Sequence, residues 1–147
     1  MNKFLKNILK ESITWGSKKG NRFYDQHGEL IDFVDKEIRK YFNLSQYSGS
    51  DYSVQWSAIF DKIKGKPDLE HLSNLLKSNF GKDYDFKYKL YGKGDLRLVI
   101  NKQRGFVSEV VITPKDVNKM SMVLKMSIND YGTNPKVLNV YFELTKK

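Results

Sequence analysis

The stretch TPKDVNKMSMVLKMSI, residues 113–128, decides between two folds for the C-terminal half of this 147-residue chain. Its first four residues, Thr113 to Asp116, are typical of a capped helix start. The apolar residues that follow instead alternate without a break: Met120, Met122, Leu124, Met126 and Ile128. A helix would turn Met122 and Met126 away from the core. The alternation favours a strand and an antiparallel meander of five strands, whereas a helix would give the order α-β-β-β-α-β.

Other parts of the C-terminal half repeat the period of two that strands require. One predicted strand begins at Tyr84 and places Phe86, Tyr88 and Leu90 on the same face. Further strands are predicted over 96–100, 106–112 and 137–144, with turns at 92–94 and 101–105. The C-terminal half is therefore predicted to be a sheet.

Helical periodicity dominates the N-terminal half. Residues 1–12 predict a short, basic, amphipathic helix, 29–42 a core helix, and 67–81 a helix with Pro67 in its first turn and Gly81 as its stop. Residues 53–63 fit both a strand and a helix, and we expect a helix. Glycines predict a loop over 13–28, and polar residues predict a linker over 43–53.

These patterns predict an α+β fold in which three to four N-terminal helices pack against a C-terminal antiparallel sheet of four to five strands. The length suits one domain over residues 1–147. Within it, 1–22 would form a basic helix and loop, 23–81 a mainly helical half, and 82–147 the sheet half.

Composition excludes several kinds of chemistry. The chain has no cysteine, which rules out disulfides, thiolate catalysis and cysteine-bound metals. It has two histidines, His27 and His71, which are far apart in the sequence, and we expect each to have a surface or core role. No apolar run reaches the roughly 20 residues that span a membrane. We therefore expect a cytoplasmic protein, in the host cytoplasm if it is phage-encoded, with no integral membrane association.

The formal net charge of +9 is uneven along the chain. Residues 1–22 carry +5, 23–60 carry −3, 61–92 carry +2 and 93–147 carry +5. Such an asymmetry favours an anionic partner, either nucleic acid or an acidic protein surface. Solubility alone would explain the same excess.

Two groups of cations are candidate binding residues. Lys18, Lys19 and Arg22 lie among aromatic residues, a mixture that suits phosphate contact and base stacking. In the sheet, a hairpin that turns at residues 92–94, with Tyr91 opposite Asp95, would place Lys89 opposite Arg97, with three more cations nearby: Lys87, Lys102 and Arg104. Like charges across a strand pair cost stability, so this stripe indicates a binding surface, unless Asp85 and Glu109 neutralise it.

The predicted hairpin with its tip at 101–105 has another interpretation, which rests on its acidic residues. The sequence GKGD at 92–95 opens one predicted strand and Glu109 lies within the next. Over residues 68–113 the layout resembles the PD-(D/E)xK nucleases, among them the Holliday-junction resolvases. The resemblance implies that Asp95 and Glu109 hold a catalytic Mg²⁺, but the position of the family's catalytic lysine holds Val111. The simpler alternative is that Arg97 lies opposite Glu109 as an ion pair.

The same family motif can also be spelled with Pro67-Asp68 and the run Asp85-Phe86-Lys87. There the context explains the acids, because Asp68 lies at the start of a predicted helix and Asp85 at the start of a strand.

The stretch Leu9 to Ser12 is similar to the leader cleavage sites of proteins packaged in the capsids of large tailed phages. Taken together, we expect a small, basic, non-enzymatic protein from a phage or other mobile element, without a cofactor, that binds nucleic acid or a nucleic-acid-handling protein. The alternatives are a metal-dependent nuclease or its inactive descendant, and a packaged phage structural protein.

Overall fold

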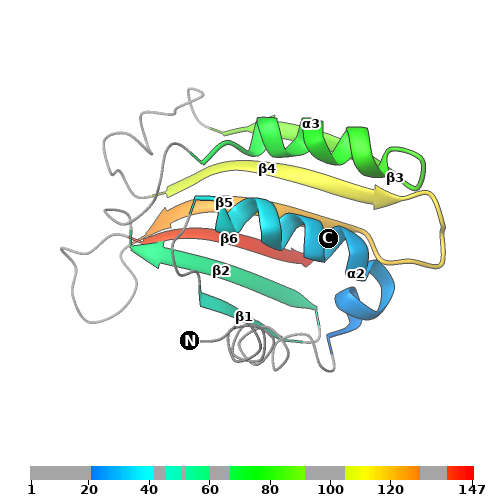
Figure 1. Ribbon diagram of the computed structural model, residues 1–147, viewed down its shortest axis with the longest axis horizontal. Helices are drawn as coiled ribbons and strands as arrows, with labels where there is room; N and C mark the ends of the chain where they lie inside the picture. The colour runs from blue at the N-terminus through cyan, green and yellow to red at the C-terminus, as the bar shows by residue number, and fades with distance from the viewer. Residues whose placement is uncertain (1–20, 42–45, 51, 60–66, 92–104, 130–138) are drawn as a thin grey trace, which may run out of the picture.

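The structure, a computed structural model, describes residues 21–41, 46–50, 52–59, 67–91, 105–129 and 139–147. They form one antiparallel sheet of six strands in the order β1-β2-β6-β5-β4-β3, with two helices packed on one of its faces (Figure 1). The helices are α2 (Arg22–Arg39) and α3 (Leu69–Phe80). The strands are β1 (Gln46–Ser50), β2 (Ser53–Ile59), β3 (Tyr84–Leu90), β4 (Gly105–Pro114), β5 (Met122–Asn129) and β6 (Asn139–Lys146).

The predicted α+β class is confirmed, but the described residues contain two helices and do not bear out the expected three to four. Residues Ser53–Ile59, expected to be helical, form strand β2. Val54 and Trp56 are both fully buried although they are two residues apart, which a strand achieves and one face of a helix does not. Pairing with β6 decides the outcome for this ambiguous stretch. Residues 46–50 of the expected linker form strand β1, and the predicted helix over 1–12 lies outside the described residues.

The alternating apolar residues within 113–128 form a strand, as predicted. Strand β5 lies between β4 and β6, and four of its side chains are at most 2% exposed: Met122, Leu124, Met126 and Ile128. The Thr-Pro pair expected to start a helix instead ends β4, and a turn over 115–119 follows. Strands β3 to β6 therefore form a meander, and the order α-β-β-β-α-β is wrong.

Helix α3 begins and ends close to the predicted positions. The Asp68 carboxylate caps it by accepting hydrogen bonds from the backbone N–H groups of Glu70 and His71, and Pro67 precedes this cap rather than lying in the first turn. At the other end, a Cβ on Gly81 would lie 2.5 Å from the Lys77 carbonyl oxygen, so glycine is needed there. The sequence thus encodes both ends of α3.

Helix α2 begins earlier than expected. Asn21 caps it by accepting from the N–H of Tyr24, so residues 22–28, expected to be loop, are helical. Its backbone is kinked at His27, where φ is −131° and ψ is 29°. The glycine next to the kink made this segment look like a loop.

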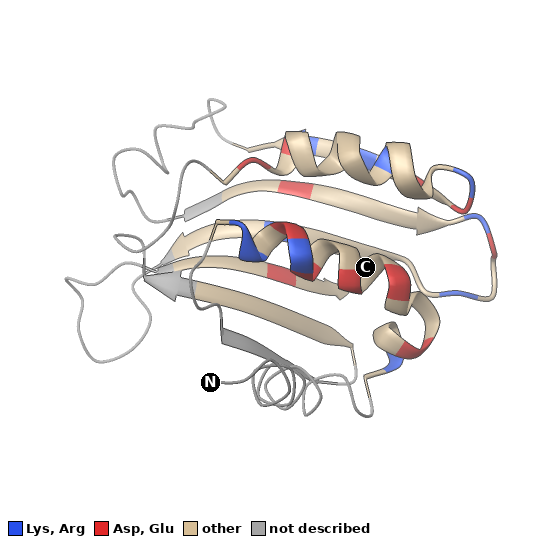
Figure 2. Cartoon of the chain, in the orientation of Figure 1, with Lys and Arg blue, Asp and Glu red and all other residues tan. Residues whose placement is uncertain are grey.

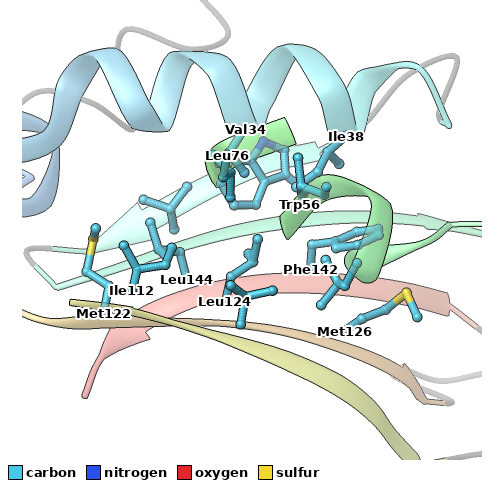
Figure 3. Close-up of a cluster of buried hydrophobic side chains, with 14 of the residues drawn as sticks. Val34, Ile38, Trp56, Leu76, Ile112, Met122, Leu124, Met126, Phe142 and Leu144 are labelled. Carbon is cyan, nitrogen blue, oxygen red and sulfur yellow. The ribbon is translucent and has the colours of Figure 1, made fainter. Parts of the chain in front are cut away.

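The hydrophobic core lies between the two helices and the sheet (Figure 3). Val34 and Ile38 of α2 and Leu76 of α3 point toward Trp56 and Phe142 on the strands. Helix α3 packs on β3 and β4 and contacts α2. Neither described helix is long and apolar enough to cross a membrane.

Candidate functional site

A cleft of about 460 Å³ lies where the kink of α2 meets the end of α3 and the turn between β4 and β5. Its volume falls in the range of small-ligand sites. Eleven residues line it: Gln26, His27, Gly28, Glu29, Leu30, Phe80, Asp83, Tyr84, Lys115, Asp116 and Lys119. The cleft therefore has an apolar and aromatic floor beneath a charged rim.

His27 and Tyr84 form a hydrogen-bonded pair in the floor of the cleft. The His27 ring is 2% exposed; its Nε2 lies 3.0 Å from the Met120 carbonyl oxygen and its Nδ1 lies 2.7 Å from the Tyr84 hydroxyl. A carbonyl oxygen only accepts, so Nε2 carries the proton and Nδ1 accepts from Tyr84. The pair joins α2, β3 and the turn after β4, and a further hydrogen bond from the Met120 N–H to Gln26 adds to this joint.

The surroundings keep both members of the pair neutral. Burial lowers the pKa of His27; the hydrogen bond to Met120 opposes this shift, and the positive charge of Lys119 adds to it. Burial also raises the pKa of Tyr84, with smaller contributions from the negative charges of Asp83 and Glu29. Because protein groups occupy both ring nitrogens, the pair is a structural joint rather than a base presented to a ligand.

The rim of the cleft carries both signs of charge. Figure 2 shows acidic and basic positions close together in the turn between β4 and β5. The Lys115 ammonium donates to the Gly81 carbonyl oxygen at 3.0 Å, and Asp116 accepts from the backbone N–H of Asn118. The described residues contain no group of three or more histidine, cysteine, aspartate or glutamate side chains that could hold a metal ion.

Glu109, the described member of the predicted metal pair, lies between two lysines. Its directly opposite residues are Lys89 on β3 and Lys125 on β5. Described strands thus flank Glu109 on both sides, and the predicted hairpin register that places Arg97 opposite Glu109 is wrong. Sequence reasoning assumed that β4 pairs with the stretch just before it, whereas β4 pairs with β3. Asp95 lies outside the described residues, so its joint role with Glu109 remains a prediction.

The row through Glu109 continues across the sheet with alternating charges. In the face opposite the helices it reads Lys89, Glu109, Lys125 and Glu143, each directly opposite the next, and it continues through Gln55 of β2 to Ser48 of β1. Opposite charges at paired positions stabilise a sheet, and a shift of the register by one residue would destroy this order. The row therefore helps to fix the register of four strands.

The predicted stripe of like charges is corrected by this row. Lys89 pairs with an acid, and its ammonium lies 5.0 Å from the centre of the Tyr91 ring. Lys87 is exposed and lies opposite Val111. Val111 stands where the PD-(D/E)xK nucleases have their catalytic lysine. Arg97, Lys102 and Arg104 lie outside the described residues. Glu109 therefore offsets repulsion at Lys89, as the alternative reading expected, and the part of the stripe that contains Arg97 stays a prediction.

The second possible match to the nuclease motif, which uses Asp68 and Asp85, is explained by the structural positions of these residues, as predicted. Asp68 caps the start of α3 and Asp85 is exposed near the start of β3, which follows the end of that helix. A helix of 12 residues is roughly 18 Å long, so the two acids lie at opposite ends of the helix–strand unit. They do not form one site.

Arg22 is the described member of the predicted basic and aromatic group. Its neighbour Phe23 is fully buried and Tyr24 is half-buried, so neither offers a free ring for stacking. Arg22 instead lies over Tyr52, with its guanidinium carbon 5.7 Å from the ring centre. Lys18 and Lys19 lie outside the described residues.

Sequence reasoning missed the contacts that distant segments make. His27 and Tyr84 are 57 positions apart and carry no local motif. His71 is exposed on α3, so the two histidines have the core and surface roles that we expected.

Comparisons of the chain with protein-family models, with curated protein sequences and with solved structures gave no match. The functional argument therefore rests on the residues of this chain alone.

Proposed function

We propose that this protein binds nucleic acid, without catalysing a reaction on it, through cationic sequence segments that join strands at one end of its sheet. The observation that carries this proposal is how charge is divided along the chain. The described residues hold 13 lysines and arginines against 12 aspartates and glutamates, whereas the whole chain holds 26 against 17. The sequence segments 1–20, 60–66 and 92–104 hold twelve lysines and arginines against three acids, which equals the whole net charge of +9.

The described body neutralises much of its own charge. Lys89 and Lys125 alternate with Glu109 and Glu143 in the sheet row. On α2, Arg39 forms an ion pair with Asp35 at 2.9 Å and Lys40 forms one with Glu37 at 2.8 Å. Figure 2 shows acidic positions along most of this helix and basic positions near its two ends. The body is thus a poor polyanion binder compared with the rest of the chain.

The sheet topology attaches two of the cationic segments to the same end of the molecule. Leu90, Gly105 and Asn139 lie at that end, as do Ile59 and Asn129, because these residues end or begin neighbouring antiparallel strands. This end of the strands lies on the left in Figure 1. The sequence that joins Leu90 to Gly105 holds Lys93, Arg97, Lys102 and Arg104 against Asp95, and the sequence that follows Ile59 holds Lys62, Lys64 and Lys66 against Asp61.

A concentration of cations at one end suits a partner that presents closely spaced negative charges. Nucleic acid does so along its whole backbone, and cations that contact phosphates displace condensed counterions. The salt dependence of binding therefore reports how many cations take part. An acidic protein surface would not give binding to oligonucleotides.

The test measures fluorescence anisotropy with a labelled single-stranded and a duplex oligonucleotide over a series of salt concentrations. The variant Arg97→Gln/Lys102→Gln/Arg104→Gln is compared with the matched control Lys77→Gln/Lys82→Gln/Lys119→Gln, whose three lysines are exposed and lie toward the other end of the sheet. We expect the first variant to lose about one unit of salt slope for each lost phosphate contact and the control to bind like wild type. Equal loss in both variants, or no binding by wild type, would contradict the proposal.

A further inference from the structure

A second cationic feature lies at the opposite end of the sheet, around Tyr52. The guanidinium carbon of Arg22 lies 5.7 Å from the centre of the Tyr52 ring, and the ammonium of Lys146 lies 5.2 Å from the same point. Both distances fall within the range of cation–π interactions. One aromatic ring thus collects two positive charges from segments that are far apart in the sequence.

The fold holds this cluster in place. The Tyr52 ring packs edge-on against Phe23, which is fully buried, with 6.0 Å between ring centres and 74° between ring planes. The N–H of Lys146 donates to the Tyr52 carbonyl oxygen at 3.3 Å. The Asn21 side chain donates to the Ser53 carbonyl oxygen at 3.1 Å, which ties the start of α2 to the start of β2. Three separate elements therefore position the two cations.

The two cations have no acidic ion-pair partner among the described residues. Within the part of the chain that the structure describes, Arg22 and Lys146 take part in no ion pair, in contrast to Arg39 and Lys40 on the same helix as Arg22. Both side chains are exposed. Two like charges beside one ring repel each other, and an anion between them would remove that cost. The first turn of α2, which begins at Arg22, adds partial positive charge at the same place.

We propose that Arg22 and Lys146, held over Tyr52, form a binding site for a phosphate group. The planar guanidinium can donate two parallel hydrogen bonds to two oxygens of one phosphate, and the ammonium can act as a point charge on a third. The same chemistry is present in free phosphate and in the phosphodiester of a nucleic acid. This site consists of described residues outside the 92–104 sequence and does not depend on the proposed function.

The test follows backbone amide resonances of the full chain by NMR while sodium phosphate is added, with sodium chloride at equal ionic strength as the reference. We expect phosphate-specific shifts at Phe23, Tyr52 and Lys146, and at least tenfold weaker phosphate binding in Arg22→Gln/Lys146→Gln. Lys147→Gln, which removes the adjacent exposed lysine, should bind phosphate like wild type. Tyr52→Phe keeps the ring and should also bind like wild type, whereas Tyr52→Leu should weaken binding.

Shifts of equal size in chloride, shifts spread over all lysines, or unchanged phosphate binding in the double variant would overturn the site. A second titration with a short oligonucleotide then separates the two sources of phosphate. Competition between the oligonucleotide and phosphate identifies a phosphodiester contact, and phosphate binding without competition identifies a site for free phosphate. If the protein binds phosphate at this site but does not bind oligonucleotides, the proposed function fails and the phosphate site stands. If it binds oligonucleotides but not phosphate at this site, the phosphate site fails and the proposed function stands.

Discussion

Replacing Asp35 by alanine should be among the most destabilising changes on α2. One carboxylate oxygen of Asp35 accepts from the Trp56 indole N–H at 2.7 Å and from the Arg39 Nε at 2.9 Å. Trp56 is fully buried, and the Asp35 side chain is 12% exposed. The second terminal nitrogen of Arg39 is also buried and has no hydrogen-bond partner. Asp35 therefore provides the charge balance for a nearly buried guanidinium as well as an acceptor for the largest core side chain.

The cost follows from what the alanine leaves behind. A buried N–H without a partner costs about 1 to 3 kcal/mol, and breaking a buried ion pair on one side costs about 3 to 5 kcal/mol. Because the Arg39 side chain is still 23% exposed, we expect Asp35→Ala to lower the free energy of unfolding by about 3 to 4 kcal/mol in total. Urea unfolding followed by far-ultraviolet circular dichroism measures this change, provided that the denaturant slope is unchanged.

Two companion variants test the reasoning. Asp32→Ala removes an exposed acid from the same helix and should cost about 0.5 kcal/mol or less. Asp35→Ala/Arg39→Ala removes the stranded guanidinium and should recover about 1 kcal/mol relative to Asp35→Ala. A loss below 1 kcal/mol for Asp35→Ala, or a double variant with the full additive loss, would refute the account of this contact.

Three further predictions concern the joint, the helix end and the sheet row. Because burial lowers the pKa of His27, the unfolded protein binds more protons near pH 6 than the folded protein. The free energy of unfolding should therefore fall as the pH drops from about 7.5 through 6.5. Urea titrations at each pH should show a weaker pH dependence in His27→Gln and a wild-type pH dependence in His71→Gln. Gly81→Ala should cost more than about 1 kcal/mol, because its methyl group would clash with the Lys77 carbonyl oxygen, and a midpoint of thermal unfolding equal to wild type would contradict this. Glu109→Lys would place three lysines in a row and should cost about 1 to 2 kcal/mol, partly recovered at 1 M salt; a loss independent of salt would point to packing instead.

Much of the sheet could be predicted because the alternation of inward-facing and outward-facing residues is visible in the sequence of a single strand. The alternation in β3 and β5 was sufficient to identify both strands, and the approximate ends of α3 were predicted from Pro67 and Gly81. Strand β2 was missed because Val54 and Trp56 fit a strand while Ile59 and Ile63 also fit a helix, and the partner strand that decides, β6, comes at the other end of the sequence. Pairing between distant segments has no local signature in one sequence.

The candidate sites show the same limit. The sequence identified Arg22 as a cation near aromatic residues, but the ring that it meets is Tyr52 and its companion is Lys146. Glu109 was noticed for its mid-strand position, yet its neighbours depend on which strands flank β4. Residue types were readable, while the contacts that give them a role depend on sheet order.

The measurement that tests the central claim most directly is the salt dependence of oligonucleotide binding by wild type and by Arg97→Gln/Lys102→Gln/Arg104→Gln. We predict that the logarithm of the binding constant falls linearly with the logarithm of the salt concentration, and that the triple variant has a slope smaller by about two to three units. Wild-type binding that is insensitive to salt, or a triple variant with an unchanged slope, would contradict the claim that these cations bind nucleic acid.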